Sequence, residues 1–600
     1  MKYTGYDTRD SKLGTSSKGI SNIEMKRLWI WLTLLLSILV ACSRDNLIPT
    51  EPVMQDGVWT GSGEGRSGII LVRVTVLEHR ITDIVVVSQG ESSFAQDAIK
   101  GMVARALEKQ SILDDVDAIS GATLTSNGMI EAINMAIRSA LGQGDSGKTI
   151  YKDGGCDVVI VGAGGAGLTA AVQAASGGDL RVIVLEKQGI LGGNTNYSTG
   201  GINAAGTQAQ RDLGIQDSPE LFYEDTMRGG KQKNIPALVR SLVDHAAATL
   251  AWLSSLGADL SDVGLMGGSS VKRTHRPKGG TAIGSHLMKV LKEASSKSNI
   301  EIRTSNKVIG LISDAGEVTG VKVENADGST YRLQAKAVVI ATGGFGANLE
   351  MVTRYQPSLS GFATLNHPGA TGDAFSWLAD VGGSTIQMEY IQIHPTAEAD
   401  NHILITEAVR GNGAILVNRA GNRFVNEMET RDVVSSAILN QENADAYLVF
   451  DQSVRSSLSS IETYANQHLL TEGTDLETLA SKAGLPASAF CATMVRYASF
   501  QKSGVDEDFG RSSTQMTAAL ETPPFYAIRV KPAIHHTMGG IRVDPEMHVL
   551  RADGTPVPGL FAAGEVTGGV HGANRLGGNG VADIVVNGKI AGQNAAEYAK

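Results

Sequence analysis

One glycine-rich turn constrains the fold of this chain more than any other feature. The apolar run Asp157–Val161 leads directly into Gly-Ala-Gly-Gly-Ala-Gly at residues 162–167. Leu168–Ala175 then has a helical pattern, and a second apolar run, Val182–Leu185, ends at Glu186. This order of strand, glycines, helix, strand and acid predicts a dinucleotide-binding βαβ unit. The glycines admit a pyrophosphate, the helix N-terminus stabilises its charge, and Glu186 follows at the spacing of a ribose-binding carboxylate.

The sequence beyond this unit favours FAD over NAD. Leu191–Thr195 and Gly200-Gly201 follow the acid closely, which suits an extended cofactor that continues across the sheet. Val338–Ala341 reads as a further strand, and Thr342-Gly343-Gly344 forms a turn after it. Gly559–Glu565, near the C-terminus, supplies a second flavin contact. We therefore predict an α/β, Rossmann-like FAD domain.

Charge and cysteine content exclude several classes of function. The 600-residue chain has a formal net charge of -10, which makes nucleic acid an improbable partner, so an anionic substrate must be captured by local arginines. Three cysteines cannot supply the four ligands of a typical iron–sulfur cluster, and no Cys-Xaa-Xaa-Cys-His sequence is present for an attached haem. Redox cofactors should therefore be organic, and no metal site is predicted.

The N-terminal region has the pattern of a targeting segment. Met25-Lys26-Arg27 precedes a short apolar run that ends in Leu39-Val40-Ala41-Cys42. This end resembles a bacterial lipobox, which implies lipidation of Cys42 and an extracytoplasmic, lipid-anchored protein at the periplasmic or cell-surface side of a membrane. A short membrane anchor and an ordinary signal peptide are the alternatives. The polar sequence before Met25 leaves Met1 or Met25 open as the true start.

Residues 55–144 have the size and pattern of a small α+β domain. Gly68–Val76 and Ile81–Val87 are β-rich runs joined by a short turn. Ala95–Lys109 has a helical pattern. These elements are expected to form a unit that precedes the dinucleotide-binding fold.

The sequence Ser-Gly-Ala-Thr at residues 120–123 carries the cofactor prediction for this small domain. Asp117 precedes it, and a helical pattern over 130–141 follows, with Ser126 and Asn127 as candidate N-caps. The segment resembles the FMN-binding domain of sodium-pumping NADH:quinone reductase subunits and related electron-transfer proteins. The resemblance implies covalent FMN, whose phosphate a flavin transferase esterifies to Thr123. A phosphate at a helix N-terminus is also physically favourable.

Arginines and titratable side chains gather in the C-terminal half of the chain. Thr406–Arg410 is followed by Arg431, and His535-His536 and Arg575 lie close to paired glycines. This combination suits a site for a small polyanion. Taken alone, Glu407 and Arg410 are spaced as an intrahelical ion pair.

Ordered motifs across residues 150–600 resemble the soluble, periplasmic type of fumarate reductase, within the fumarate reductase/succinate dehydrogenase flavoprotein family. The motifs are His394-Pro395-Thr396, Thr406–Gly411, Thr430–Asp432, His535–Gly540 and Asn574-Arg575. The resemblance implies that a hydride from N5 of FAD reduces fumarate to succinate. FAD should be non-covalent, because Asn194 stands where some members carry a histidine that binds FAD covalently. The candidate FAD-binding residues are Gly162, Gly164, Gly165, Ala166, Gly167, Glu186, Lys187, Asn194, Thr195, Gly200, Gly201, Val308, Asp373, His536, Glu565, Arg575 and Gly578.

The same resemblance assigns roles around the substrate. Arg575 and His535 would hold one carboxylate, His394 and Thr406 would hold the other, and Glu407 belongs to the candidate substrate set. Arg431 would donate the proton, and Glu407 and Arg410 would resupply it. Arginine is ordinarily a poor acid because its pKa is high, so this role requires a very basic carbanion and a relay.

The expected organisation places a capping domain inside the FAD domain. We expect an α+β cap that carries the substrate chemistry, and a membrane-linked donor that passes electrons through FMN to FAD. The predicted segments are a signal (1–42), a tether (43–54), an FMN-binding domain (55–144), a linker (145–155), the FAD-binding domain (156–381 and 534–600) and the cap (382–533).

Three other functions are compatible with parts of the sequence. A reductase of another enoate, such as urocanate or methacrylate, would share the scaffold, but urocanate would dispense with one carboxylate-binding end. L-aspartate oxidase shares several residues, although the export signal and the FMN domain disfavour it. A non-catalytic electron-transfer lipoprotein would leave Arg431 and Arg575 without a purpose.

Overall fold

The computed structural model describes residues 53–65, 69–89, 95–119, 122–142 and 150–600. The predicted signal segment, most of the tether and Cys42 therefore lie outside the described residues, as do Ser120 and Gly121 of the predicted FMN motif. Residues 54–600 form one unit by their contacts.

The small N-terminal domain is a three-stranded antiparallel sheet with two helices. The strands, in the order β1-β2-β3, are β1 (Gly57–Glu64), β2 (Ile69–Leu77) and β3 (Arg80–Ser88), and the helices are α2 (Gln96–Lys109) and α3 (Thr123–Ala140). Added Cβ atoms at Gly61 and Gly63 would lie 2.0 Å from backbone oxygens of α3, so these glycines let the helix cross β1 closely. Isoleucines of α3 pack with valines of the sheet in one apolar core.

The predicted helix after the Ser-Gly-Ala-Thr motif begins earlier than expected. Its first residue is Thr123 and its N-cap is Ala122, so the prediction of an N-cap at Ser126 or Asn127 is wrong. The Oγ of Ser126 instead accepts a hydrogen bond from the backbone N–H of Ile119, at 3.1 Å. Thr123 is exposed at the start of the helix.

The central sheet of the larger fold is mixed. Its order is β10-β11-β12-β4-β5-β9, and β21 pairs with β12 and β20 with β21. The strands β12, β4, β5 and β9 are parallel, and β21 is parallel to β12, as expected of a dinucleotide-binding sheet. The bounds are β4 (Gly154–Val161), β5 (Val182–Leu185), β9 (Ile300–Arg303), β10 (Lys307–Asp314), β11 (Glu317–Glu324), β12 (Thr330–Ile340), β20 (His548–Leu550) and β21 (Pro556–Ala562).

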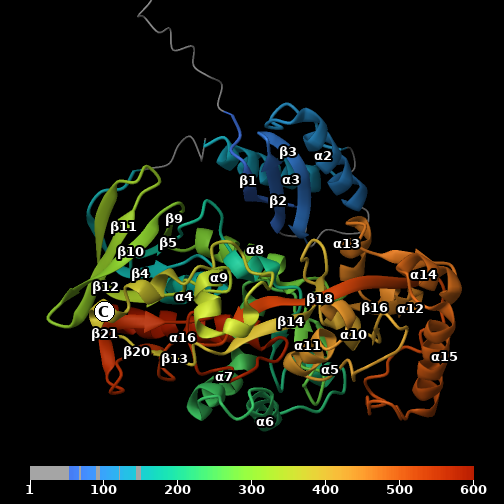
Figure 1. Ribbon diagram of the computed structural model, residues 1–600. Coiled ribbons are helices and arrows are strands. Elements are labelled where there is room, and N and C mark those ends of the chain that lie inside the picture. The colour runs from blue at the N-terminus through green and yellow to red at the C-terminus, as the bar shows by residue number, and fades with distance from the viewer. Residues whose placement is uncertain (1–52, 66–68, 90–94, 120–121, 143–149) are drawn as a thin grey trace, which may run out of the picture. The chain divides into compact units, whose positions relative to one another are not determined.

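Two helices that lie far apart in the sequence pack together beside this sheet (Figure 1). They are α4 (Gly165–Ala174), which follows the glycine turn, and α16 (Asn579–Ala599), the last element of the chain. An added Cβ at Gly592 would lie 2.2 Å from the backbone oxygen of Ala170, so this glycine allows the close approach. The N-termini of both helices therefore reach the same region of the fold.

The cap is built around a second, five-stranded sheet of order β14-β18-β16-β15, with β17 paired to β18 (Figure 1). Its strands are β14 (Ile391–Glu398), β15 (Ile415–Val417), β16 (Ala446–Asp451), β17 (Thr471–Gly473) and β18 (Phe525–Thr537). Its helices are α10 (Ala408–Gly411), α11 (Arg431–Leu439), α12 (Gln452–Ser457), α13 (Ser460–Asn466), α14 (Leu476–Ala483) and α15 (Ala487–Ser503). The strand β18 continues past residue 533 to Thr537, so one uninterrupted strand joins the cap to the FAD-binding fold.

The remaining elements surround the two sheets. They are β6 (Ile202–Asn203), α5 (Gln208–Asp212), α6 (Pro219–Gly229), α7 (Pro236–Ser255), β7 (Asp262–Gly264), β8 (Thr274–Arg276), α8 (Ile283–Ser296), α9 (Leu349–Tyr355), β13 (Thr385–Ile386) and β19 (Gly540–Ile541). Within the described ranges, every helix is too short or too polar to cross a bilayer.

Candidate active site

A long cavity connects the glycine turn to the arginines of the cap. It encloses about 1610 Å³, including space open to solvent, and its lining residues run from Val161 to Ile584. Of the predicted FAD-binding residues, those that line it are Gly162, Gly164, Gly165, Ala166, Glu186, Lys187, Asn194, Thr195, Gly200, Gly201, Val308, Asp373, His536, Glu565, Arg575 and Gly578. His394, Thr406, Glu407, Arg431 and His535 line the same cavity.

Two predicted site residues stand behind the cavity wall. An added Cβ at Gly167 would lie 1.9 Å from the backbone oxygen of Gly162, so Gly167 permits close packing of helix against strand. Arg410 is fully buried beside Glu407. Neither residue can therefore contact a ligand directly unless the wall moves.

The glycine turn forms a cradle that side chains would fill. Gly162 has a φ of +105°, and an added Cβ would lie 2.4 Å from the backbone oxygen of Ala341. Gly165 begins α4, and its backbone N–H donates to Oγ1 of Thr195 at 3.0 Å. This backbone can approach a pyrophosphate closely, and α4 points its positive N-terminal end at it.

Two acidic side chains are held by hydrogen bonds in the part of the cavity where the adenosine half of FAD is expected. Glu186 ends β5, and its carboxylate accepts from the backbone N–H of Ala163 at 2.9 Å and of Gln188 at 2.8 Å. Burial raises the pKa of Glu186, although these hydrogen bonds oppose the rise. Asp373 accepts from Nζ of Lys187 at 2.8 Å, which lowers the carboxyl pKa against its partial burial.

Asn194 is held beside the cavity by three hydrogen bonds. Its Nδ2 donates to Asn366 Oδ1 at 2.7 Å and to Glu565 Oε2 at 3.1 Å. Its Oδ1 accepts from the backbone N–H of His367 at 2.7 Å. Glu565 is buried, and burial raises its pKa. The amide thus orients a carboxylate beside the cavity.

Several buried polar atoms along this wall have no protein partner in the described part of the chain. They include His367 Nε2, His536 Nε2 and Arg575 Nε, all from residues that line the cavity. A buried donor or acceptor without a partner is costly, so such atoms are suited to hydrogen-bond a ligand. Together with the glycine cradle, the cavity and its donors fit a large polar cofactor such as FAD.

Arg431 and Glu407 form the central contact of the cap side. Arg431 is the first residue of α11, and its Nε donates to Glu407 Oε2 at 2.8 Å. Glu407 Oε1 also accepts from the backbone N–H of Gly267. Arg410 follows on the short helix α10, and its NH2 lies 3.9 Å from Glu407 Oε2. Burial opposes ionisation of Glu407, but Arg431 and Arg410 outweigh it, and the Glu407 pKa is lowered.

The carboxylate-binding candidates meet on the facing side. The rings of His394 and His535 pack edge to face, with centroids 5.1 Å apart. Thr406 is fixed through its backbone N–H, which donates to the buried hydroxyl of Tyr464 at 2.9 Å. Arg575 is buried, and its NH1 donates to its neighbour's backbone oxygen at 3.2 Å. The cavity therefore presents cationic and neutral donors from strands β14 and β18 and from the two loops that carry Thr406 and Arg575.

Burial in the site disfavours the charged forms of both its histidines and its arginines, so their pKa values are lowered. Burial, followed by repulsion from Arg431, lowers the pKa of His394 and of His535 well below the usual value. Burial lowers the pKa of Arg575 to about 9 and that of Arg410 to about 10. Arg575 and Arg431 line the cavity together with the neutral histidines, so an anionic ligand there would relieve the repulsion between these two cations.

Comparison with known proteins identifies the group to which this chain belongs. A family model described as "FAD binding domain" matches residues 157–581, and one described as "FMN-binding domain" matches residues 65–138. A fumarate reductase (cytochrome) from Shewanella frigidimarina is 47% identical over 445 residues, which are 74% of this chain and 77% of that protein. The chain belongs to the fumarate reductase flavoprotein family. The expected α/β fold with an N-terminal FMN-binding domain is thereby confirmed.

One solved structure and one further relative are also similar to this chain. The open conformation of a flavocytochrome c3 fumarate reductase superposes with a TM-score of 0.63 and 41% identity, covering 75% of this chain and 79% of that one. A urocanate reductase from Eggerthella lenta is 34% identical over 568 residues, which are 90% of this chain and 92% of that protein.

Gln392 was not predicted from the sequence, although it contacts two candidate site residues of this fumarate reductase family member. It lies on β14, two residues before His394, and its Oε1 accepts from NH1 of Arg431 at 3.0 Å. Its Nε2 donates to the backbone oxygen of Arg575 and to Asn574 Oδ1, both at 2.7 Å. The side-chain amide of Gln392 therefore connects Arg431, the candidate proton donor, with the segment that carries Arg575, a candidate substrate-binding residue. Its closeness in sequence to His394 was the only signal that could have found it.

His367 was also missed. It follows Asn366 in a loop and lines the cavity, and burial together with Lys187 lowers its pKa to about 4. A neutral imidazole with an unpartnered Nε2 can accept or donate one hydrogen bond to a cofactor. No motif in the sequence singles it out.

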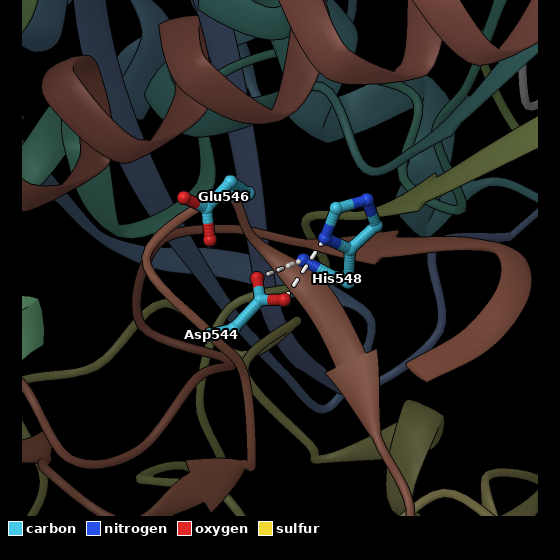
Figure 2. A group of neighbouring side chains, drawn as sticks. All are labelled: Asp544, Glu546 and His548. Carbon is cyan, nitrogen blue, oxygen red and sulfur yellow. Dashed lines mark hydrogen bonds and ion pairs between the residues drawn. The ribbon is translucent and has the colours of Figure 1, made fainter. Parts of the chain in front are cut away.

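A group of potential metal ligands lies in a different place. Asp544 and Glu546, in the turn between β19 and β20, come together with His548, the first residue of β20 (Figure 2), and none of the three lines the cavity. Asp544 accepts from the backbone N–H of His548 and pairs with its Nδ1, both at 2.9 Å. Met547 adopts a φ of +67° in the same turn. We assign these contacts to closing the turn.

Proposed function

We propose that this protein is an extracytoplasmic fumarate reductase. Its electrons would pass from a membrane-linked donor to FMN on Thr123, then to non-covalent FAD, and finally to fumarate. The observation that carries the proposal is the buried contact of Arg431 with Glu407, which lines the same cavity as His394, His535 and Arg575. This arrangement suits a substrate with two carboxylates and a double bond that needs a proton.

The two ends of the site would divide the substrate between them. Arg575 has a buried Nε without a partner in the described residues, and a guanidinium binds a carboxylate in bidentate geometry. His535 would assist at that end, and His394 and Thr406 would hold the second carboxylate. Gripping both ends orients the alkene and withdraws electron density from the carbon that is reduced.

The reaction balances as one hydride and one proton added across the double bond. Bound FAD, held by the glycine cradle, Glu186 and the wall around Asn194, supplies the hydride when it is reduced. Arg431 would place its proton on the other alkene carbon, giving succinate. Glu407 accepts from Arg431 Nε and is therefore positioned to return a proton to it. Arg410 stands behind Glu407 as the next donor.

A substrate panel tests the proposed activity. The purified holoenzyme, supplied with reduced methyl viologen, should oxidise it rapidly with fumarate and much more slowly with urocanate or methacrylate. Rapid turnover with urocanate and none with fumarate would contradict the assignment. The urocanate reductase likeness across both flavin-binding regions makes that compound the necessary competitor.

The FMN and anchoring proposals have their own test. Thr123 is exposed at the first turn of α3, as esterification by a flavin transferase would require. Mass spectrometry of protein made in a host with the transferase should find one FMN-sized adduct on Thr123, and FAD released by denaturation. Diacylglycerol on Cys42 should appear in the same sample, and Cys42→Ser should release the protein from the membrane fraction. An unmodified Thr123 or Cys42 in that sample would contradict the corresponding assignment.

A further inference from the structure

Arg410 is not held in place by the carboxylate that it would serve. Its NH2 lies 3.9 Å from Glu407 Oε2, which is longer than a hydrogen bond. Its Nε and NH2 are buried and have no hydrogen-bond partner among the described residues. Something other than Glu407 must therefore fix the direction of this guanidinium.

A closed ring of hydrogen bonds supplies that constraint. Arg410 NH1 donates to the backbone oxygen of Glu427 at 2.6 Å. The Glu427 carboxylate accepts from Arg511 NH1 at 3.2 Å. Arg511 NH2 then donates to the backbone oxygen of Arg410 at 2.8 Å. The ring thus holds both the backbone and the side chain of Arg410.

Glu427 is the anchor of the ring. It is fully buried, and its carboxylate also accepts from Arg423 Nε and NH2, both at 2.9 Å. The backbone N–H of Leu416 donates to the same group at 3.2 Å. A buried carboxylate with this many charge-assisted partners is rigid, because movement would cost Arg511 the one carboxylate that pairs with its side chain in the described residues, although Arg423 would keep Asp506.

Glu427 also lies on the segment that carries the proton donor. It precedes Arg431 by four residues, and Arg431 reaches Glu407 from the first turn of α11. Fixing Glu427 therefore sets the positions of Arg410 and Arg431 relative to one another on both sides of Glu407. The ring makes no contact with the cavity, so its effect is on the path and not on the ligand.

We propose that Glu427 is a positioning residue for proton resupply, which keeps Arg410 aimed at Glu407 through the ring with Arg511. This inference rests on the proposed function of Arg431, Glu407 and Arg410. It has a specific kinetic consequence. The first turnover uses the proton already on Arg431, whereas every later turnover requires the path through Arg410. Loss of the ring should therefore spare the first turnover and slow the following ones.

The experiment compares the two phases in Glu427→Gln. The holoenzyme is reduced, mixed with fumarate in a stopped-flow instrument, and then followed with excess reduced methyl viologen. We expect the first turnover to stay within about threefold of wild type and the steady-state rate to fall about tenfold or more, a smaller loss than the roughly 10²- to 10⁴-fold expected when a proton-transfer group is itself removed. The solvent deuterium isotope effect should rise in the steady state only. Equal slowing of both phases, or no change in either, would overturn the proposal.

Two further variants keep the result interpretable. Asp445→Asn is the matched control, because Asp445 is buried in the same domain and accepts two hydrogen bonds from Arg419 at 2.8 and 2.5 Å, away from the ring. It should lower the melting temperature without separating the two phases. If Glu427→Gln fails to retain FAD, Arg511→Lys replaces it, since lysine keeps the charge but cannot hold Glu427 and Arg410 together. Arg511→Lys without a fast first turnover would overturn the proposal.

The wild-type arm separates this inference from the proposed function. If the wild type does not reduce fumarate, the substrate assignment fails, and the two-phase test is repeated with the enoate that is reduced. If the wild type turns over but the variants show no separation of phases, the role of Glu427 fails alone. FAD content and succinate binding, measured by flavin fluorescence, should remain at wild-type values in all retained variants.

Discussion

Arg575, on the proposed substrate-binding wall, and Arg431, the proposed proton donor, line the same cavity, but their hydrogen bonds are arranged in opposite ways. On the binding wall, Arg575 Nε and His536 Nε2 are buried without partners among the described residues. On the proposed proton path, Arg431 is bound to both Glu407 and Gln392, while Arg410 behind it has two buried nitrogens, Nε and NH2, without partners among the described residues. The contrast is therefore between Arg575 and Arg431. Arg575 keeps a free donor that can bind an anion, whereas the hydrogen bonds of Arg431 fix its guanidinium in one orientation.

The largest effect should come from removing Arg431, the proposed proton donor. Arg431→Ala leaves Arg575 and His535 in place, so substrate should still bind, but no group remains to protonate the substrate. We expect kcat to fall about 10²- to 10⁴-fold with KM changed little, the range for loss of general acid catalysis. Steady-state viologen oxidation measures both constants. A nearly normal kcat with bound FAD would contradict the division of the site.

Replacing Arg575, by contrast, should change KM more than kcat. Arg575→Met deletes a charge-assisted carboxylate contact, at a cost of about 3 kcal/mol, or roughly a hundredfold in affinity. The loss should appear mainly in KM and in succinate binding. Because Arg575 also lines the FAD region, FAD content is the control measurement. An unchanged KM would show that the carboxylate is held elsewhere.

Acid should separate the two regions by their effect on stability. The pKa of His394 and His536 is lowered well below the unfolded value of about 6.5, so their contribution is present above pH 6.5 and lost as the pH falls below it. Glu407 also has a lowered pKa, and its contribution is lost only below about pH 4.5. Denaturant unfolding should therefore show stability falling between pH 6.5 and 5.5, by up to about 1.4 kcal/mol per pH unit for each histidine.

A histidine variant checks the origin of that slope. In His394→Asn the decline between pH 6.5 and 5.5 should be shallower than in the wild type, because one titrating group has been removed. A slope that is unchanged would assign the decline to other groups.

The smallest effect on the FAD site should come from Thr123→Ala. This change removes the proposed FMN attachment and leaves the cavity intact. Fumarate reduction with methyl viologen, which can reduce FAD directly, should stay within about twofold of wild type, as for an exposed substitution away from the site. Reduction by membranes should be lost. Loss of the viologen activity as well would show that FMN is required for the FAD site itself.

The local pattern of apolar residues was sufficient to predict those strands that are buried runs of aliphatic side chains. The strand β5 was predicted to the residue, because four buried aliphatic residues lie between a charged start and Glu186. The strand β1 was missed, since its Gly- and Ser-rich sequence has no apolar alternation and is explained only by the close approach of α3. The start of α3 was placed too late because no ordinary capping side chain marks it.

The candidate site divides in the same way. Arg431, Glu407 and Arg575 are recognisable because they belong to motifs. Gln392 and Glu427 are not, because their roles depend on contacts between elements that are far apart in the sequence, as between Glu427 and Arg511. Such contacts follow from the tertiary packing of β14, α10 and α11, which no local spacing encodes.

The most direct test compares Glu407→Gln and Arg575→Met in one experiment. Pre-reduced enzyme is mixed with increasing fumarate, and multiple-turnover rates are recorded until they reach a plateau. The account predicts that Glu407→Gln lowers the plateau at an unchanged half-saturating concentration, because Arg431 loses its partner while the binding wall remains. Arg575→Met should raise the half-saturating concentration and leave most of the plateau. Parallel changes of both quantities in both variants would contradict the separation of binding from proton delivery.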